Sequence, residues 1–239
     1  MSRPVIISIE GNIGAGKTTA INKLEKHILS NMKTNDNHIL FLREPVNVWD
    51  TIKDPSGETI LEKFYKDSNK YAFAFQVMAY ATRTANIKNA IKQNPDCKII
   101  ICERSLEADN NVFAKMLKDD GKIEDIQYQI YEHFYHAGKD DLNTDAIIYI
   151  DSSPSVCHER INRRSREGED GISIDYLQSC RDYHDKWLVD DPPIPVLRIN
   201  TNEDVNYDYQ DPDDKGVIWL NTMEKFIRRF PDVVASDSD

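Results

Sequence analysis

The sequence has few cysteines and no long apolar run, and each of these absences argues against a class of protein. Its four cysteines, at 97, 102, 157 and 180, form no C-x-x-C pair and have no metal-ligand spacing, which argues against a disulfide framework or a zinc site. We expect reduced, buried thiols. No apolar stretch approaches the length of a transmembrane helix. Only MSRP precedes the first apolar run, so we expect no targeting segment and a cytoplasmic location.

Positive charge is also scarce. The chain has 30 Lys and Arg against 41 Asp and Glu, a net charge of −11. Such an acidic protein is poorly suited to nucleic acid or to an anionic membrane surface, and we expect neither as a partner. An anionic ligand would have to meet a local cluster of basic residues. The length of 239 residues suits one domain with a lid or insertion. We predict this domain over residues 1–232 and a frayed tail over 233–239.

Five short apolar runs, rich in Ile and Val, predict strands of a parallel sheet that is covered on both faces. They span residues 5–10, 39–44, 98–103, 146–151 and 195–200. The segments between them predict helices over residues 17–32, 57–93 (two helices), 106–118, 123–136, 153–164 and 174–188. This alternation predicts an α/β fold with a doubly wound sheet, whose ligands bind at the carboxyl ends of the strands. Three of the runs end there in Glu10, Glu44 and Glu103, and the acidic segment 202–216 predicts a loop.

The segment GNIGAGKT, residues 11–18, matches G-x-x-x-x-G-K-[ST] in full and lies between a predicted strand and a predicted helix. Its glycines let the backbone wrap around phosphate oxygens, and the helix N-terminus supplies positive potential. Lys17 is expected to reach the β- and γ-phosphates and Thr18 to hold Mg²⁺. The motif predicts a nucleoside triphosphate site. A GTPase is disfavoured, because the nearest match to N-K-x-D is NKLE at 22–25, inside the first helix.

Two acidic residues at strand ends are candidates for phosphoryl-transfer chemistry. Glu44, in REPVNVW, is placed to accept a proton from an attacking hydroxyl. Glu103, in CERS, is a candidate magnesium ligand, and Arg104 beside it would orient Glu44 and neutralise phosphoryl charge. Taken alone, these residues are equally compatible with a solvated glutamate and a structural Arg–Glu pair.

The segment HERINRRSREGED, residues 158–170, is the basic cluster that the net charge requires. Arg160 and Arg164 are four residues apart on one helix face. Arg166 follows where Ser165 and Gly168 loosen the helix. Arginines on such a segment predict a lid over about residues 160–170 that closes on phosphates and excludes water. The alternative is a solvated basic helix face.

Five motifs occur in order: GNIGAGKTT, EPVNVW, FAFQVMAYATR, ERSLEADNNVFAKML and RINRRSREGE. Together they make the chain resemble the deoxynucleoside kinase family, which includes deoxycytidine, deoxyguanosine and deoxyadenosine kinases, from about Val5 to Asn200. The resemblance implies a P-loop kinase fold with a five-stranded parallel sheet and a homodimer. It also implies transfer of the γ-phosphoryl group of ATP to the 5′-hydroxyl of a deoxynucleoside, in nucleotide salvage.

The same resemblance implies residue roles. Glu44 matches the general base, with Arg104 beside it, and Thr18 and Glu103 match the magnesium ligands. ATP would be bound by Gly11, Asn12, Ile13, Gly14, Ala15, Gly16, Lys17, Thr18 and Thr19 and by the lid residues Arg160, Arg164 and Arg166. The deoxynucleoside would be bound by Glu44, Arg83, Arg104 and Asp109, by Tyr65 and Glu169 at the sugar 3′-hydroxyl, by Gln76 at the base edge, and by the aromatic walls Trp49, Phe75 and Phe113. The catalytic residues implied by the resemblance are Glu44, Arg104 and Lys17.

Arg83 and Asp109 match positions that separate branches of the family. A buried Arg–Asp pair is costly unless it is hydrogen-bonded, so a base with an exocyclic amine is a fitting ligand. The resemblance therefore favours deoxyadenosine, deoxyguanosine or deoxycytidine over thymidine. The chain departs from the family at Asn110, where many members have arginine, and the three bases stay unranked.

Two other functions are compatible with the phosphate loop. A nucleoside monophosphate kinase of the thymidylate kinase type would need an arginine for the acceptor phosphate, and Arg43, Arg83 or Arg104 could supply it. Glu44 argues against this reading, because a carboxylate base would repel a phosphate. The second alternative is a nucleotide-binding regulatory subunit without turnover.

Overall fold

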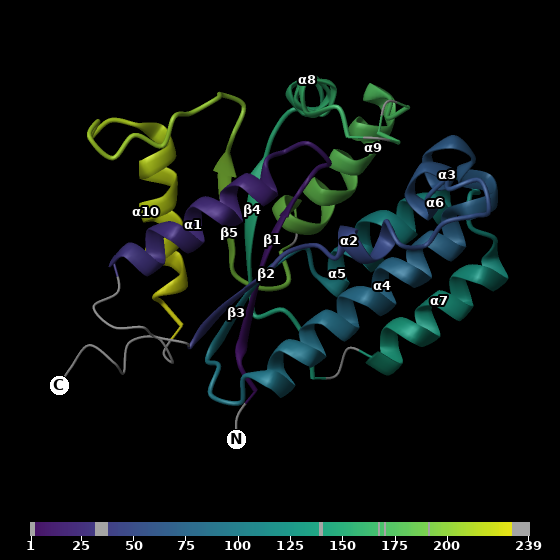
Figure 1. Cartoon of the computed structure of the whole chain (residues 1–239), viewed down its shortest axis with the longest axis horizontal. Coiled ribbons are helices and arrows are strands. Elements are labelled where there is room, and N and C mark those ends of the chain that lie inside the picture. Colours follow the sequence, from purple (N-terminus) through teal and green to yellow (C-terminus); the bar gives the residue numbers. More distant parts are fainter. Residues whose placement is uncertain are drawn as a thin grey trace.

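All five predicted strands form, and they build one parallel sheet in the order β2-β3-β1-β4-β5 (Figure 1). The structure, a computed structural model, describes residues 3–31, 38–138, 141–166, 168–169, 171–190 and 192–230. The predicted tail at 233–239 lies outside these residues. The strands are β1 (Val5–Gly11), β2 (Ile39–Leu42), β3 (Ile99–Glu103), β4 (Ala146–Asp151) and β5 (Val196–Asn200). The predicted α/β fold with a five-stranded parallel sheet is confirmed.

Helices connect the strands and cover both faces of the sheet (Figure 1). They are α1 (Lys17–Asn31), α2 (Val46–Trp49), α3 (Ile60–Lys66), α4 (Ser68–Gln93), α5 (Leu106–Ala108), α6 (Lys115–Asp119), α7 (Asp125–Gly138), α8 (Pro154–Arg164), α9 (Ile174–Asp185) and α10 (Lys215–Ile227), with two π-helical turns, η1 (Asp109–Ala114) and η2 (Lys186–Asp190). The predicted lid begins within α8, at Arg160, and extends toward α9.

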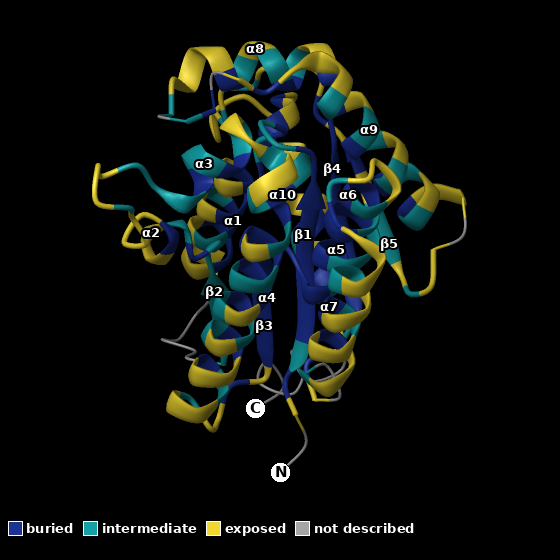
Figure 2. Cartoon of the chain, turned by 90° about the vertical axis from the view of Figure 1, so that its right-hand side faces the viewer, coloured by how far each residue is buried: buried dark blue, intermediate teal, exposed yellow. Residues whose placement is uncertain are grey.

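Alternating side chains of β1 supply two hydrophobic cores, because successive residues of a strand point to opposite faces. Ile7 and Ile9 belong to the core that contains Leu24 of α1 and Leu220 of α10. Ile6 belongs to the core on the other face, with residues of α4 and α7. Buried strands lie between helices whose outer sides are exposed (Figure 2). The central strand therefore carries the phosphate loop on a rigid support.

Helix α10 was not predicted from the sequence. The predicted loop over 202–216 ends at Asp214, whose side chain accepts a hydrogen bond of 2.9 Å from the backbone N–H of Val217 and so caps the helix. Its buried residues Leu220, Met223, Phe226 and Ile227 follow a helical spacing. The start signal and the period were both present in the sequence, behind a run of aspartates.

Other boundaries also differ from the prediction. Strand β2 ends at Leu42, so Glu44 lies two residues beyond it and not at its last position. The helix predicted over 106–118 forms as a continuous helical segment, but the π-helical turn η1 interrupts its α-helical winding between α5 and α6. The end of the helix predicted over 153–164 is confirmed: α8 ends at Arg164, and Ser165 caps it in the left-handed conformation with φ 49°.

None of the helices formed by the described residues combines the length and the apolar character that a membrane crossing requires.

Candidate active site

A cavity of about 780 Å³ lies at the carboxyl ends of the central strands. Parts of the phosphate loop, α3, α4, η1, the lid and the loop after β5 line it. Its size suits a small-molecule ligand. Nearly all of the predicted site residues line this one cavity; Gly11 and Asn12 lie outside its lining.

The phosphate loop adopts the glycine-dependent backbone that its motif predicts. Gly14 has φ 78° and Gly16 has φ 101°, both in the left-handed region. A Cβ at Gly14 would lie 2.5 Å from the carbonyl oxygen of Cys157 on α8, so no side chain fits there. Residues from Ile13 to Thr19 face the cavity. The loop thus presents backbone and small side chains to a ligand, as a phosphate cradle does.

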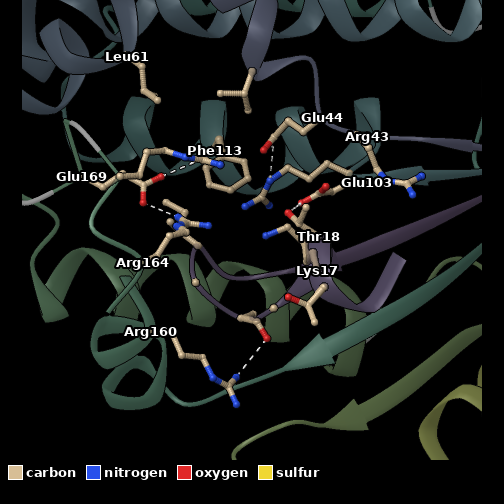
Figure 3. Close-up of a pocket in the computed structure, with 18 of the residues that line it drawn as sticks. Lys17, Thr18, Arg43, Glu44, Leu61, Glu103, Phe113, Arg160, Arg164 and Glu169 are labelled. Atoms are coloured by element: carbon tan, nitrogen blue, oxygen red, sulfur yellow. Dashed lines mark hydrogen bonds and ion pairs between the residues drawn. The ribbon is translucent and has the colours of Figure 1, made fainter. Parts of the chain in front are cut away.

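Lys17 is buried at the start of α1. Its Nζ donates to the carbonyl oxygen of Asn12 at 2.8 Å. Burial and the nearby Arg104 guanidinium lower the pKa of Lys17 to about 8, against the opposing effect of Glu103 and Glu44. The ammonium group lies beside the glycine-rich loop, where the motif predicts it (Figure 3).

Thr18 and Glu103 meet across the ends of α1 and β3. The hydroxyl of Thr18 donates to Oε1 of Glu103 at 2.7 Å (Figure 3). A hydroxyl and a carboxylate next to a phosphate cradle form an oxygen donor set that suits Mg²⁺.

Glu44 lies between two arginines. Its Oε1 accepts from Nη2 of Arg83 at 3.0 Å and lies 3.3 Å from Nε of Arg104. Burial alone would raise the pKa of Glu44, but Arg104, Arg83 and Lys17 outweigh it and lower the pKa to about 2. Glu44 is therefore a charged carboxylate at the edge of the cavity.

Arg104 holds its position at the cost of an unfavourable backbone conformation. Its φ of 64° lies in the left-handed region, which residues with a side chain rarely adopt. Its Nη1 donates to the carbonyl oxygen of Gly11 at 3.1 Å, and its guanidinium lies 4.5 Å from the ring centroid of Phe113. Such strain clusters at functional sites, and here it turns the guanidinium toward Glu44.

Arg83 and Asp109 form a buried ion pair at the far end of the cavity. Nε and Nη2 of Arg83 donate to the two carboxylate oxygens of Asp109 at 2.9 and 3.3 Å. A third nitrogen, Nη1, donates to the carbonyl oxygen of Glu103 at 3.0 Å. Burial raises the pKa of Asp109, and Arg83 opposes that rise. Both residues line the cavity, so the pair faces a ligand.

Aromatic residues and one amide form the walls beside this pair. Trp49 and Phe75 contact edge to face with ring centroids 5.4 Å apart, and Phe75 stacks on Phe64 at 4.7 Å. Gln76 is buried and lines the cavity, and its Oε1 has no hydrogen-bond partner among the described residues. A flat slot with an unpaired amide oxygen suits a planar ring with polar edges.

The lid arginines are paired with acidic residues. Arg164 and Arg166 both form ion pairs with Glu169, the second at 3.3 Å, and Glu169 is buried (Figure 3). Burial and Glu169 raise the pKa of the Tyr65 phenol. Arg160 binds the exposed Asp204 at 3.0 Å and also donates to the carbonyl oxygen of Ala15 at 3.3 Å. The segment predicted as a lid therefore contributes side chains both beside the phosphate-loop motif and beside Tyr65.

Sequence reasoning missed several residues that line the cavity. Arg163 of α8 pairs with Asp204 at 2.8 Å, and Tyr176 of α9 and Trp219 of α10 also face the cavity. Arg163 stood in the basic cluster and could have been included with its neighbours. Tyr176 belongs to no motif, so no sequence pattern gave a reason to select it. Trp219 lies on α10, which was not predicted.

Known proteins resemble this chain over most of its length. The family model described as deoxynucleoside kinase matches residues 7–228. A probable deoxycytidine kinase of Fowlpox virus is 37% identical over 204 residues, which cover 83% of this chain and 79% of that protein. Deoxycytidine kinase of Homo sapiens is 27% identical and covers 91% of each chain. A mitochondrial thymidine kinase 2 of Macaca fascicularis is also 27% identical, over 80% of this chain and 67% of that protein.

Proposed function

Because the chain belongs to the deoxynucleoside kinase family, we propose that it phosphorylates the 5′-hydroxyl of deoxyadenosine, deoxyguanosine or deoxycytidine in preference to thymidine, in nucleotide salvage. Family membership makes it an ATP-dependent nucleoside kinase. We propose, beyond this, the preferred base and the role of each residue in the site.

The observation that carries the base preference is the buried Arg83–Asp109 pair in the cavity wall. Arg83 favours the charged form of Asp109 against the effect of burial, and a carboxylate accepts hydrogen bonds but donates none. Adenine, guanine and cytosine each offer an exocyclic amine as donor. At the ring position where these bases carry the amine, thymine has a carbonyl oxygen with a methyl group beside it, so it would leave a buried carboxylate facing an acceptor.

In the proposed reaction, Glu44 accepts the proton of the 5′-hydroxyl while the 5′-oxygen bonds to the γ-phosphorus. The bond from that phosphorus to the β,γ-bridging oxygen breaks, and ADP leaves. Arg104 and Lys17 stabilise negative charge on the transferring group. The lid residues Arg164 and Arg166 would add positive charge and exclude water once the donor is bound.

Mg²⁺ fits the pair formed by Thr18 and Glu103, whose oxygens lie 2.7 Å apart beside the phosphate loop. When bound there, the ion would neutralise charge on the β- and γ-phosphates. We propose these two residues as its ligands, Glu103 directly or through water.

A monophosphate kinase requires a cation for the acceptor phosphate, and the three candidate arginines are already paired. Arg43 is part of the cavity lining, but its guanidinium binds Glu25 and Asn22 of α1 (Figure 3). Arg83 binds Asp109 and Glu44, and Arg104 lies beside Glu44. These partners favour a neutral hydroxyl acceptor over a phosphate.

The decisive experiment measures ATP-dependent formation of 5′-monophosphates from the four natural deoxynucleosides, with Mg²⁺, side by side. We expect activity on one or more of deoxyadenosine, deoxyguanosine and deoxycytidine, with thymidine poor. Equal efficiency on thymidine and on all three would refute the Arg83–Asp109 interpretation. Phosphorylation of monophosphates alone would support the thymidylate-kinase-type alternative, and no turnover at all would support a regulatory subunit.

We also propose a homodimer through α7. Ile126, Ile130 and Phe134 repeat every four residues along this helix and are 64%, 43% and 51% exposed. An apolar stripe of this kind marks a protein contact. Ile130→Asp should turn a dimer into a monomer in light scattering, and an unchanged mass would remove α7 from the interface. The cytoplasmic location stays a prediction.

A further inference from the structure

Asn12 belongs to the phosphate-binding segment, but its side chain bonds to a distant helix. It is 3% exposed and lies outside the lining of the cavity. Its Nδ2 donates to the carbonyl oxygen of Leu177 on α9 at 2.8 Å, and its Oδ1 accepts from the backbone N–H of Ile13 at 2.8 Å. A buried amide that is satisfied in this way holds two backbone segments in a fixed relation.

The segment that Asn12 binds is the base of the lid. Helix α9 begins at Ile174, shortly after the lid, and Leu177 lies in its first turn. The helix before the lid, α8, touches the phosphate loop at Gly14, where an added Cβ would lie 2.5 Å from the carbonyl oxygen of Cys157. The phosphate loop is thus held against both helices that carry the lid.

The backbone of Asn12 takes part in the phosphate cradle. Its carbonyl oxygen accepts from Nζ of Lys17 at 2.8 Å and from the N–H of Ala15 at 3.2 Å. A shift of Asn12 relative to α9 would therefore also move Lys17 relative to the lid arginines.

We propose that Asn12 is a positioning residue, whose amide fixes the lid helices to the phosphate loop so that Lys17 and Arg164 converge on the same phosphate. This inference rests on the proposed role of the lid arginines in binding the donor. A misplacement of about 1 Å costs up to about a hundredfold in rate, so one buried hydrogen bond at the base of the lid is enough to matter.

The test is Asn12→Asp, which keeps the size of the side chain but places a carboxylate oxygen against the carbonyl of Leu177. With ATP and the best deoxynucleoside saturating, kcat should fall about tenfold or more. Deoxynucleoside affinity measured without ATP should change less than about twofold, since Asn12 lies outside the cavity. Peptides covering residues 160–169 should exchange backbone hydrogen faster than in the wild type.

Asn94→Asp is the matched control. Nδ2 of Asn94 donates to the carbonyl oxygen of Ala90 at 2.9 Å, which is the same bond type at the end of α4, and Asn94 lies outside the cavity lining. This variant should keep the wild-type kcat and lid exchange.

A folded Asn12→Asp protein with wild-type kcat overturns the proposal, whatever its lid exchange. If that variant does not fold, Asn12→Ser gives the same readouts with a side chain too short to reach Leu177. Failure of the proposed lid role looks different: Arg164→Ala would then keep the wild-type kcat, while lid exchange in Asn12→Asp would still rise.

Discussion

The two ends of the cavity are built in different ways. The end proposed for the donor is built around one continuous segment, the glycine-rich loop whose residues 13–18 line the cavity, and α8 adds arginines to it. The acceptor end assembles side chains from α2, α3, α4, η1 and the strand exits, held by ion pairs such as Arg83–Asp109. A backbone cradle binds any triphosphate, because phosphates are alike. Side chains from many segments can be substituted one at a time, so we expect the choice of substrate to be set at the acceptor end.

The largest effect that we expect comes from Glu44, where the two ends meet. Glu44→Gln should lower kcat by about a hundredfold to ten-thousandfold, because a general base is lost. Deoxynucleoside affinity should change little, and steady-state kinetics with separate binding titrations check both. Glu25→Gln, the same change beside Arg43 on α1, should have no effect. Unchanged turnover in Glu44→Gln would remove Glu44 from the mechanism.

The lid tests the donor end. Arg164→Ala should lower kcat by about a hundredfold through loss of charge at the phosphate, and should leave deoxynucleoside binding nearly intact. Arg163→Ala, one residue earlier on α8 and paired with the exposed Asp204, should have the smaller effect. If Arg164→Ala lost only deoxynucleoside affinity, the lid would belong to the acceptor end.

A change at the Arg83–Asp109 pair should affect the acceptor end alone. Asp109→Asn should raise KM for amine-bearing deoxynucleosides about tenfold, because one good hydrogen bond to the base is weakened. The KM for ATP should stay at the wild-type value. Equal changes in both KM values would indicate general unfolding of the cavity, which thermal melting would reveal.

The smallest expected effect is in the pH profile. Burial opposes ionisation of Glu44, but Arg104, Arg83 and Lys17 lower its pKa from 4.5 to about 2. A depressed pKa means that the charged form stabilises the fold above pH 4.5, and that this contribution disappears only as the pH falls toward 2. Glu44 should therefore cause no acid limb in kcat/KM between about pH 5 and 8. A limb near pH 6 that disappeared in Glu44→Gln would contradict this ionisation state.

The difference between a contiguous loop and a wall assembled from distant residues also explains which parts of the site could be predicted from the sequence alone. The sheet and the donor end followed from apolar runs and one contiguous motif, since their signals lie within a few residues of each other. The pairing of Arg83 with Glu44 and Asp109 joins residues 39 and 26 positions apart, and only the resemblance to a family suggested part of it. The left-handed Arg104 and the bond from Asn12 to α9 depend on tertiary packing, which no local pattern encodes. Helix α10, by contrast, has a capping aspartate and a helical spacing of apolar residues in its sequence, and it could have been predicted.

The π-helical turn η1 has a consequence for how this pocket can change over evolution. A π-helical turn is equivalent to one residue inserted into an α-helix, and Asp109 and Phe113 lie within it. Deleting one codon between them could therefore be absorbed by a return to α-helical winding, and α6 would keep its orientation. The change would be confined to the part of the cavity wall that lies within η1. A deletion that would disrupt a regular helix could thus alter this wall and leave the rest of the fold in place.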